Sequence, residues 1–220
     1  MPDFAALRER MVEEQLRARG IADARLLDAF RATPRELFVA EEGRDFAYED
    51  GPLPIAAGQT ISQPYIVALM IEAARVGPGE RVLEVGAGSG YAAAILSRIA
   101  TEVIAIERHP ELAEAARERL AALGCSNVRI VQGDGSAGLP EDVPFDAILV
   151  AASGRVVPEP LRRQLAVGGT LVMPLGPPDT VQKLVRVIRL GEEDFEEEDL
   201  GPVRFVPLVG EQGWEEPGSA

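Results

Sequence analysis

Three glycines at alternate positions follow a short apolar run in the first half of the chain. Gly86, Gly88 and Gly90 come directly after residues 81–85 and precede the alanine-rich residues 91–100. An apolar strand, a glycine turn and a helix start, in this order, direct backbone N–H groups and the positive end of a helix dipole at a ligand. We therefore expect an electron-rich ligand at this turn.

The spacing of the glycines narrows the choice of ligand. A dinucleotide-binding turn has the pattern G-x-G-x-x-G or A, whereas Tyr91 occupies the sixth position here. Glu84 lies at the end of the preceding strand, where a carboxylate would meet a cationic amine but repel a pyrophosphate. The turn thus favours a nucleoside that carries an amino acid.

Two further acidic residues follow the next two expected strands. Glu107 stands 21 positions after Gly86, at the tip of the strand expected over residues 102–106. In nucleotide-binding α/β folds a carboxylate at this place accepts both ribose hydroxyls. Asp134 lies between two glycines after the strand expected over residues 127–132, and it either forms a turn or accepts the exocyclic amine of adenine.

A polar cluster precedes the apolar helix expected over residues 66–74. It contains Thr60 and Ser62, and Gln59 precedes and Gln63 follows this pair. Ser62 is a common N-cap residue and Pro64 suits a first helical turn, so the cluster has a purely structural interpretation. A helix N-terminus with these groups can equally orient a carboxylate. Both interpretations remain open from the local pattern.

The elements that must position these groups alternate between strand and helix. Five strands are expected over residues 81–85, 102–106, 127–132, 145–150 and 170–174, with helices between them. This alternation predicts an α/β fold with a largely parallel sheet, helices on both faces and ligands at the carboxyl ends of the strands. Residues 181–190 and 203–209 predict an antiparallel pair that closes the sheet edge, and the acid-rich residues 192–199 predict a solvated hairpin between them.

The two ends of the chain lack the alternation of strands and helices that is predicted for its centre. Residues 3–18 predict an amphipathic helix, and Asp23 is the expected N-cap of a second one. We expect a single domain over residues 1–210, made of an N-terminal helical and loop extension (1–78), a cofactor-binding core (79–175) and C-terminal strands (176–210). Residues 211–220 are expected to be disordered.

Composition excludes several classes of function. The net charge of −14 over 220 residues opposes binding to nucleic acid or anionic lipid. No apolar run approaches the roughly 20 residues of a membrane span and the N-terminus lacks the apolar core of a signal peptide, so we expect a cytoplasmic monomer. Cys125 and His109 are the only residues of their types, which excludes an internal disulfide and a Cys/His metal cluster. His109 is expected at the surface.

Several separate stretches together resemble the protein-L-isoaspartate O-methyltransferases of the bacterial type. The resemblance extends to about Leu208 and rests on five stretches: Gly-Gln-Thr-Ile-Ser-Gln-Pro-Tyr at 58–65, Val-Leu-Glu-Val-Gly-Ala-Gly-Ser-Gly-Tyr at 82–91, Ile-Glu-Arg at 106–108, Gly-Asp-Gly at 133–135 and Val-Arg-Phe-Val-Pro-Leu at 203–208. Many methyltransferases share the glycine turn. The Thr-Ile-Ser segment and the Phe-Val-Pro-Leu ending are more specific to this family.

The resemblance implies a Rossmann-like methyltransferase fold and an enzyme that repairs damaged proteins. It implies transfer of a methyl group from S-adenosylmethionine to the free α-carboxylate of L-isoaspartyl residues, which leaves S-adenosylhomocysteine and an ester that collapses to a succinimide. Ser62 matches the proposed active-site serine of the family, with Thr60 beside it, and Thr60 and Ile61 line the methyl-donor pocket. The implied cofactor contacts also include Glu84, Gly86, Ala87, Gly88, Ser89, Gly90, Tyr91, Glu107, Arg108, Asp134 and Gly135, and no metal is implied.

The implied reaction suits the residue types present. A carboxylate with a reference pKa of about 4 is already ionised at neutral pH, so its attack on a sulfonium methyl group needs no general base. A dry pocket that aligns the two groups helps more than a strong cationic clamp, because opposite charges are neutralised in the transition state. Ser62 and Thr60 are therefore expected to orient the carboxylate.

Two departures from the family pattern leave alternatives open. Residues 151–155 read Ala-Ala-Ser-Gly-Arg where the family commonly has Thr-Ala-Ala-Ala-Pro, and Ser136 stands where an aromatic residue is frequent. Both lie near the expected substrate mouth. One alternative is a methyltransferase of this fold that acts on another carboxylate, a modified peptide or a small molecule. The other is a non-catalytic nucleotide-binding module, which the intact hydroxyl cluster disfavours.

Overall fold

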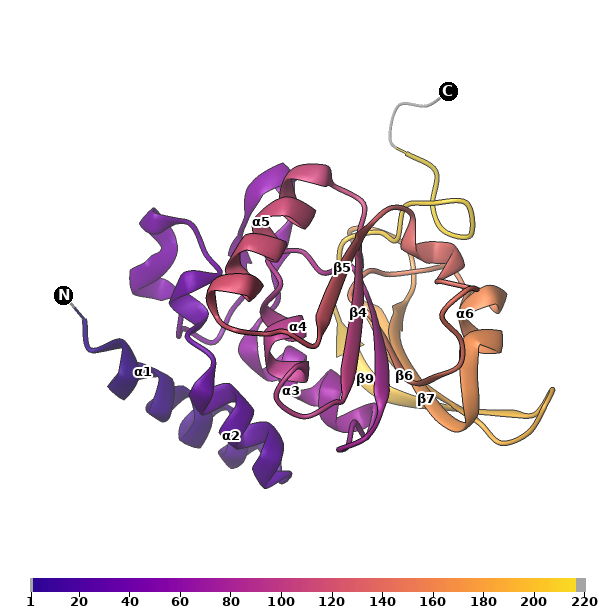
Figure 1. The fold of residues 1–220 in the computed structure, drawn as a ribbon, viewed down its shortest axis with the longest axis horizontal. Helices are drawn as coiled ribbons and strands as arrows, with labels where there is room; N and C mark the ends of the chain where they lie inside the picture. Colours follow the sequence, from indigo (N-terminus) through magenta and orange to yellow (C-terminus); the bar gives the residue numbers. More distant parts are fainter. Residues whose placement is uncertain (1, 217–220) are drawn as a thin grey trace.

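A computed structural model describes residues 2–216 and is organised around a seven-stranded sheet (Figure 1). The strand order is β5-β4-β3-β6-β7-β8-β9, and the strands are β3 (Arg81–Val85), β4 (Glu102–Glu107), β5 (Val128–Gln132), β6 (Phe145–Val150), β7 (Leu165–Leu175), β8 (Gln182–Arg189) and β9 (Phe195–Val203). The strands β3 to β7 run parallel, and β8 and β9 are antiparallel to their neighbours. The predicted fold class is confirmed.

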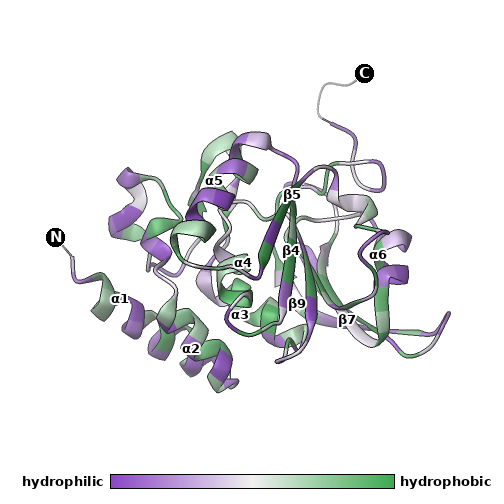
Figure 2. Ribbon diagram, viewed as in Figure 1, coloured by the Kyte–Doolittle hydropathy of each residue, from purple (hydrophilic) through white to green (hydrophobic). Residues whose placement is uncertain are grey.

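Helices cover both faces of this sheet. Figure 1 shows α3 (Pro64–Ala73), α4 (Tyr91–Leu96) and α5 (Pro110–Ala122) on one side, and α6 (Glu159–Gln164) on the other. Strand residues alternate between the two faces, as the pleat requires, so that Val82 and Leu83 belong to two separate apolar clusters. Figure 2 shows hydrophobic colour on β4 and α3 and mixed colour on the outer helices. The sheet is therefore buried on both faces.

The N-terminal extension packs on the outside of α3 and α4. It contains α1 (Phe4–Met11), which continues through a π-helical turn (Val12–Leu16) and a 3-10 turn (Arg17–Arg19), and α2 (Ala24–Ala32), which Asp23 caps by accepting the N–H of Arg25 at 2.9 Å. Short 3-10 turns follow at Arg35–Leu37, Glu41–Phe46 and Ala56–Gly58, and β1 (Leu53–Pro54) pairs with β2 (Thr60–Ile61). Met11 and Phe30 share one apolar cluster with Val82, and the predicted subdivision of the domain stays a prediction. Within residues 2–216, no helix has both the length and the apolar composition of a membrane span.

The C-terminal strands differ from the prediction. The acid-rich stretch, expected as a solvated hairpin, begins the edge strand β9, in which Glu198 forms an ion pair with Arg186 and Asp199 one with Lys183. An edge strand leaves its side chains in contact with water, so repeated acidic residues are tolerated there. Of the predicted strand over 203–209, Val203 is the last residue of β9, and residues 204–209 leave the sheet. This segment crosses the carboxyl ends of the central strands. There the backbone N–H of Ser153 donates to Val206 O at 2.8 Å, and Ser153 O accepts the N–H of Leu208 at 2.9 Å.

Candidate active site at the carboxyl edge of the sheet

A cavity of about 510 Å³ lies at the carboxyl ends of β3, β4 and β6. The chain adds β4 and β5 on one side of β3, and the connection after β5 then returns to place β6 on the other side. The strand order therefore reverses here, at the kind of point where open α/β sheets bind their ligands. Most of the predicted site residues line it, namely Thr60, Ile61, Ser62, Glu84, Gly86, Ala87, Gly88, Ser89, Tyr91, Glu107, Arg108 and Gly135. Two predicted residues, Gly90 and Asp134, do not.

The glycine turn joins β3 to α4 and is fixed by backbone hydrogen bonds. The N–H groups of Gly86 and Ala87 both donate to Ile106 O, at 2.9 and 3.0 Å, which ties the turn to the neighbouring strand. Gly90 has a φ of +86°, and a Cβ there would lie 3.2 Å from the Cβ of Ala116 on α5. Gly90 therefore allows the helix start to pack closely against α5, and its predicted contact with the cofactor stays a prediction.

Two carboxyl groups are buried beside this turn. The side chain of Glu107 accepts N–H groups from Gly88 at 2.8 Å and His109 at 2.9 Å, one on each oxygen. Glu84 is 2% exposed, and its Oε2 atom has no hydrogen-bond partner among the described residues. Burial, and secondarily repulsion by Glu107, raises the pKa of Glu84 to about 8. An unpaired buried carboxyl group on a cavity wall is suited to a cationic ligand group.

The Thr-Ile-Ser segment forms another part of the wall. Thr60 and Ile61 form β2, and α3 begins at Pro64, as expected for a proline in a first turn. The N-cap of α3 is Gln63, and the Ser62 hydroxyl makes no hydrogen bond to any described residue. Ser62 therefore does not cap the helix, and its hydroxyl remains available to a ligand in the cavity.

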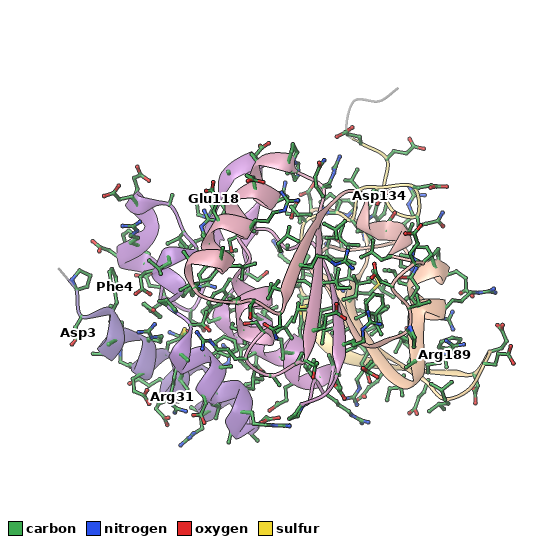
Figure 3. The ribbon with its side chains drawn as sticks, viewed as in Figure 1. Asp3, Phe4, Arg31, Glu118, Asp134 and Arg189 are labelled. Atoms are coloured by element: carbon green, nitrogen blue, oxygen red, sulfur yellow. The ribbon has the colours of Figure 1, made fainter. Side chains whose placement is uncertain are left out.

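Asp134 precedes Gly135 of the cavity wall, and its side chain lies next to the C-terminal segment (Figure 3). Its carboxylate accepts the N–H of Ser136 at 2.8 Å and the N–H of Glu211 at 2.7 Å. Partial burial opposes ionisation, but these backbone hydrogen bonds outweigh it and lower the pKa of Asp134. The carboxylate thus forms the turn and holds the backbone of residue 211, and Asp134 is not among the residues that line the cavity. Its predicted contact with adenine stays a prediction.

The same C-terminal segment is held by the residues that depart from the family pattern. Ser136 Oγ accepts the N–H of Gln212 at 3.0 Å, and Ser153 O accepts the indole N–H of Trp214 at 2.8 Å. The guanidinium of Arg155 lies over the Trp214 ring, 4.4 Å from its centroid. Residues 211–216 thus make specific contacts in the structure, and residues 217–220 lie outside the described part of the chain. The expected disorder of residues 211–220 stays a prediction.

Several wall residues were missing from the sequence-based site. His109, expected at the surface, is half-buried and lines the cavity, as do Ala151 and Ala152 at the end of β6. Residues 202–209 form much of the remaining wall, together with Ile66, Val67, Met70, Leu149 and Val181. The Phe-Val-Pro-Leu sequence at 205–208 marked this segment as typical of the family. Because the segment was predicted to be a strand of the sheet, its contact with the cavity was not predicted. Within residues 2–216, no three acidic, histidine or cysteine side chains are grouped as metal ligands.

The family profile of protein-L-isoaspartate(D-aspartate) O-methyltransferases matches residues 7–213. The chain belongs to this family. It is 64% identical over 204 residues to a protein-L-isoaspartate O-methyltransferase of Methylorubrum populi, covering 93% of this chain and 95% of the other. It is 58% identical over 211 residues to protein-L-isoaspartate O-methyltransferase 1 of Rhodopseudomonas palustris, covering 96% of this chain and 86% of the other.

Solved structures of the protein-L-isoaspartate O-methyltransferase family have the same fold. One such enzyme superposes with a TM-score of 0.85 at 31% identity, covering 94% of this chain and 67% of its own. A putative member from Plasmodium falciparum, solved in complex with S-adenosyl-L-homocysteine, gives a TM-score of 0.79 at 27% identity, covering 92% and 98% of the two chains. The family, the enzyme class and the methyl donor predicted from the sequence are confirmed.

Proposed function

We propose that this protein-L-isoaspartate O-methyltransferase binds S-adenosylmethionine along the sheet side of the cavity and places the isoaspartyl α-carboxylate beside Ser62. The observation that carries the proposal is the pair of unpartnered polar groups on one cavity. The buried carboxyl of Glu84 has an oxygen without a hydrogen-bond partner, and the hydroxyl of Ser62 is also unpartnered among the described residues. Each group gains a partner when the two ligands are bound.

The residues of the sheet side fit the methyl donor. When bound, S-adenosylmethionine supplies a methyl group activated by a sulfonium centre, and it also carries an amine and a ribose. Glu84 accepts the cationic amine, which favours the ionised form of its raised-pKa carboxyl. Glu107 holds two backbone N–H groups and retains carboxylate lone pairs for the ribose hydroxyls.

The residues of the other side orient the acceptor. Ser62 and Thr60 donate hydroxyl hydrogen bonds to the α-carboxylate, which is ionised at neutral pH and needs no base. Apolar wall residues from α3, such as Val67 and Met70, exclude water from the space between the groups. The methyl ester product then activates the carbonyl carbon for attack by the adjacent backbone nitrogen, with loss of methanol and formation of a succinimide.

We further propose that the enzyme acts as a cytoplasmic monomer on isoaspartyl proteins and peptides. The net charge of −14 disfavours polyanionic partners such as nucleic acids.

Methyl-ester formation on matched peptides tests the function. The protein is incubated with S-adenosylmethionine labelled in its methyl group and with two peptides that differ only in isoaspartate against aspartate. Base-labile label on the isoaspartyl peptide alone is expected. Equal labelling of both peptides would indicate another carboxylate specificity, and binding of the donor without labelling would indicate a non-catalytic module.

A further inference from the structure

Arg35 is a buried cation without an acidic partner. Its side chain is 0% exposed, and it takes part in none of the ion pairs formed among residues 2–216. Burying a charge away from water is costly unless hydrogen bonds or other charges compensate. Burial accordingly lowers the pKa of the Arg35 guanidinium, and the phenol groups of Tyr91 and Tyr48 oppose this shift. The contacts of Arg35 show what it holds together.

Two backbone carbonyl groups receive hydrogen bonds from this guanidinium. Nε donates to Ala47 O and Nη2 donates to Ser62 O, each at 2.8 Å, across sequence separations of 12 and 27 residues. Arg35 therefore joins both ends of the long loop between the helical extension and the Thr-Ile-Ser segment. The second hydrogen bond fixes the backbone of Ser62 itself.

The guanidinium also lies over an aromatic ring that belongs to the glycine turn. Its carbon is 4.8 Å from the ring centroid of Tyr91, the first residue of α4. Phe38 and Phe30 pack edge-on against the same ring, at centroid distances of 5.3 and 6.1 Å. Tyr91 is thus held on several sides, and Arg35 connects Ser62 to the helix start that adjoins the methyl-donor pocket.

We propose that Arg35 is a positioning residue for methyl transfer, setting the place of the Ser62 hydroxyl relative to the glycine turn through the Ser62 carbonyl. The inference rests on the proposed role of Ser62. Reaction between two bound groups depends steeply on their alignment, so an error of about 1 Å can lower the rate about 100-fold. Arg35 is not among the residues that line the cavity.

The variant Arg35→Lys tests this role because it keeps the charge and removes the planar fork. An ammonium group cannot hold two carbonyl groups in the fixed geometry of a guanidinium or stack on Tyr91 in the same way. We expect kcat for an isoaspartyl peptide to fall at least about tenfold. The Kd of S-adenosylhomocysteine, measured by calorimetry, should stay within about twofold, because Phe30 and Phe38 still hold the Tyr91 ring and no residue that lines the cavity is replaced.

A double-mutant cycle with Ser62→Ala separates positioning from general damage. If Arg35 acts through the Ser62 hydroxyl, Arg35→Lys lowers kcat in the wild-type background but has little further effect once that hydroxyl is absent. Two defects that multiply in the double variant would overturn the positioning role. A Ser62→Ala enzyme with the wild-type rate would instead overturn the role of Ser62, so the two failures are distinguishable.

Arg81→Lys is the matched control. Arg81 also donates to two backbone carbonyl groups, Asp142 O at 2.8 Å and Pro144 O at 3.0 Å, and its guanidinium carbon is 5.5 Å from the Phe145 ring centroid. It lies at the amino end of β3, away from the cavity, so kcat should remain within about twofold. If Arg35→Lys and Arg35→Gln fail to fold where Arg81→Lys folds, Arg35 serves folding and the positioning role is wrong.

Discussion

The two sides of the cavity are built in different ways. The sheet side consists of the ends of β3 and β4, where Val85 pairs with Ile106 and one glycine turn follows in sequence. The other side joins residues 60–62 to residues 202–209, and it is held by hydrogen bonds such as Arg35 to Ser62 O and Trp214 to Ser153 O, with separations of 27 and 61 residues.

This difference implies a division of labour between the two sides. Ladder hydrogen bonds and burial on both faces keep the sheet side rigid, so its residues contribute mainly to binding of the methyl donor. The other side depends on side chains that reach across the fold, so its residues contribute mainly to alignment of the acceptor. Substitutions on the sheet side should change Kd, and substitutions on the other side should change kcat or KM.

The largest effect on donor binding is expected for Glu107→Ala. It removes the proposed ribose acceptor and releases the N–H groups of Gly88 and His109 that hold the glycine turn in place, so we expect donor binding to weaken by about 2–4 kcal/mol. The Kd of S-adenosylhomocysteine, measured by calorimetry, should therefore rise about 100-fold.

Glu102→Ala provides the control on the same strand. Glu102 begins β4 and forms an ion pair with Arg81 at 2.7 Å, far from the carboxyl end. Its removal should leave Kd within about twofold, because partly exposed ion pairs contribute little. A Glu107→Ala protein that binds as tightly as this control would contradict the placement of the donor on the sheet side.

Ser62→Ala tests the other side of the cavity, where we expect turnover to change and donor binding to remain the same. We expect kcat toward an isoaspartyl peptide to fall by about 10- to 100-fold while Kd for S-adenosylhomocysteine stays within about twofold. Steady-state kinetics and calorimetry on the same preparation measure both values. Ser97→Ala, which removes only a hydroxyl bonded to Ala94 O on α4, is the control. Turnover within twofold of wild type would show that the Ser62 hydroxyl does not orient the acceptor.

Donor binding should depend on pH through Glu84. Its pKa of about 8 means that the carboxyl is largely protonated at neutral pH, and a cationic amine binds the ionised form. The affinity for S-adenosylhomocysteine should rise by up to about tenfold per pH unit as the pH approaches 8, and then level off. Calorimetry in buffers of different ionisation enthalpy should detect the released proton. Glu84→Gln should abolish both effects, and an equal pH dependence in this variant would assign them to another group.

The same shift gives a signed prediction for stability. The pKa of Glu84 is raised in the folded state above the ordinary value of 4.5, so its stabilising contribution is present below about pH 4.5 and is lost as the pH rises through about 8. Glu84→Gln should therefore become more stable relative to the wild type as the pH increases over this range. Thermal melts without ligand at several pH values measure the difference, and a constant difference would contradict the buried, unpaired state of the carboxyl.

The smallest effect is expected for the C-terminal segment. Trp214→Ala removes the hydrogen bond to Ser153 O and the ring under Arg155, which hold residues 205–209 against the cavity. We expect a change of about threefold to tenfold in KM for the peptide or in Kd for the donor, because one net hydrogen bond contributes about 1 kcal/mol. Trp214→Phe, which keeps a ring, should lie between this variant and wild type. A rise in Kd for the donor as large as that expected for Glu107→Ala would contradict the distinction between the two sides of the cavity.

The sequence alone was sufficient for the sheet side of the site. The periodicity of apolar residues predicted the strands. Glu84 and the glycine turn lie at the end of one strand and Glu107 at the end of the next, and a parallel sheet brings these ends together at one edge. The polar segment at 60–62 was also found, because its resemblance to the family is local. The roles assigned to these residues stay predictions, since their place on a cavity wall does not establish their chemistry.

Only the tertiary structure decided how the remaining parts are used. Gly90 packs on α5, Asp134 binds the backbone of residue 211, and residues 204–209 cross the strand ends instead of extending the sheet. The residues next to Arg35 in the sequence did not indicate its role, because the carbonyl groups that it binds lie 12 and 27 residues further along the chain. Periodicity and spacing report interactions within an element or between consecutive ones. Contacts between distant segments depend on how the chain packs, and these contacts build the acceptor side of the cavity.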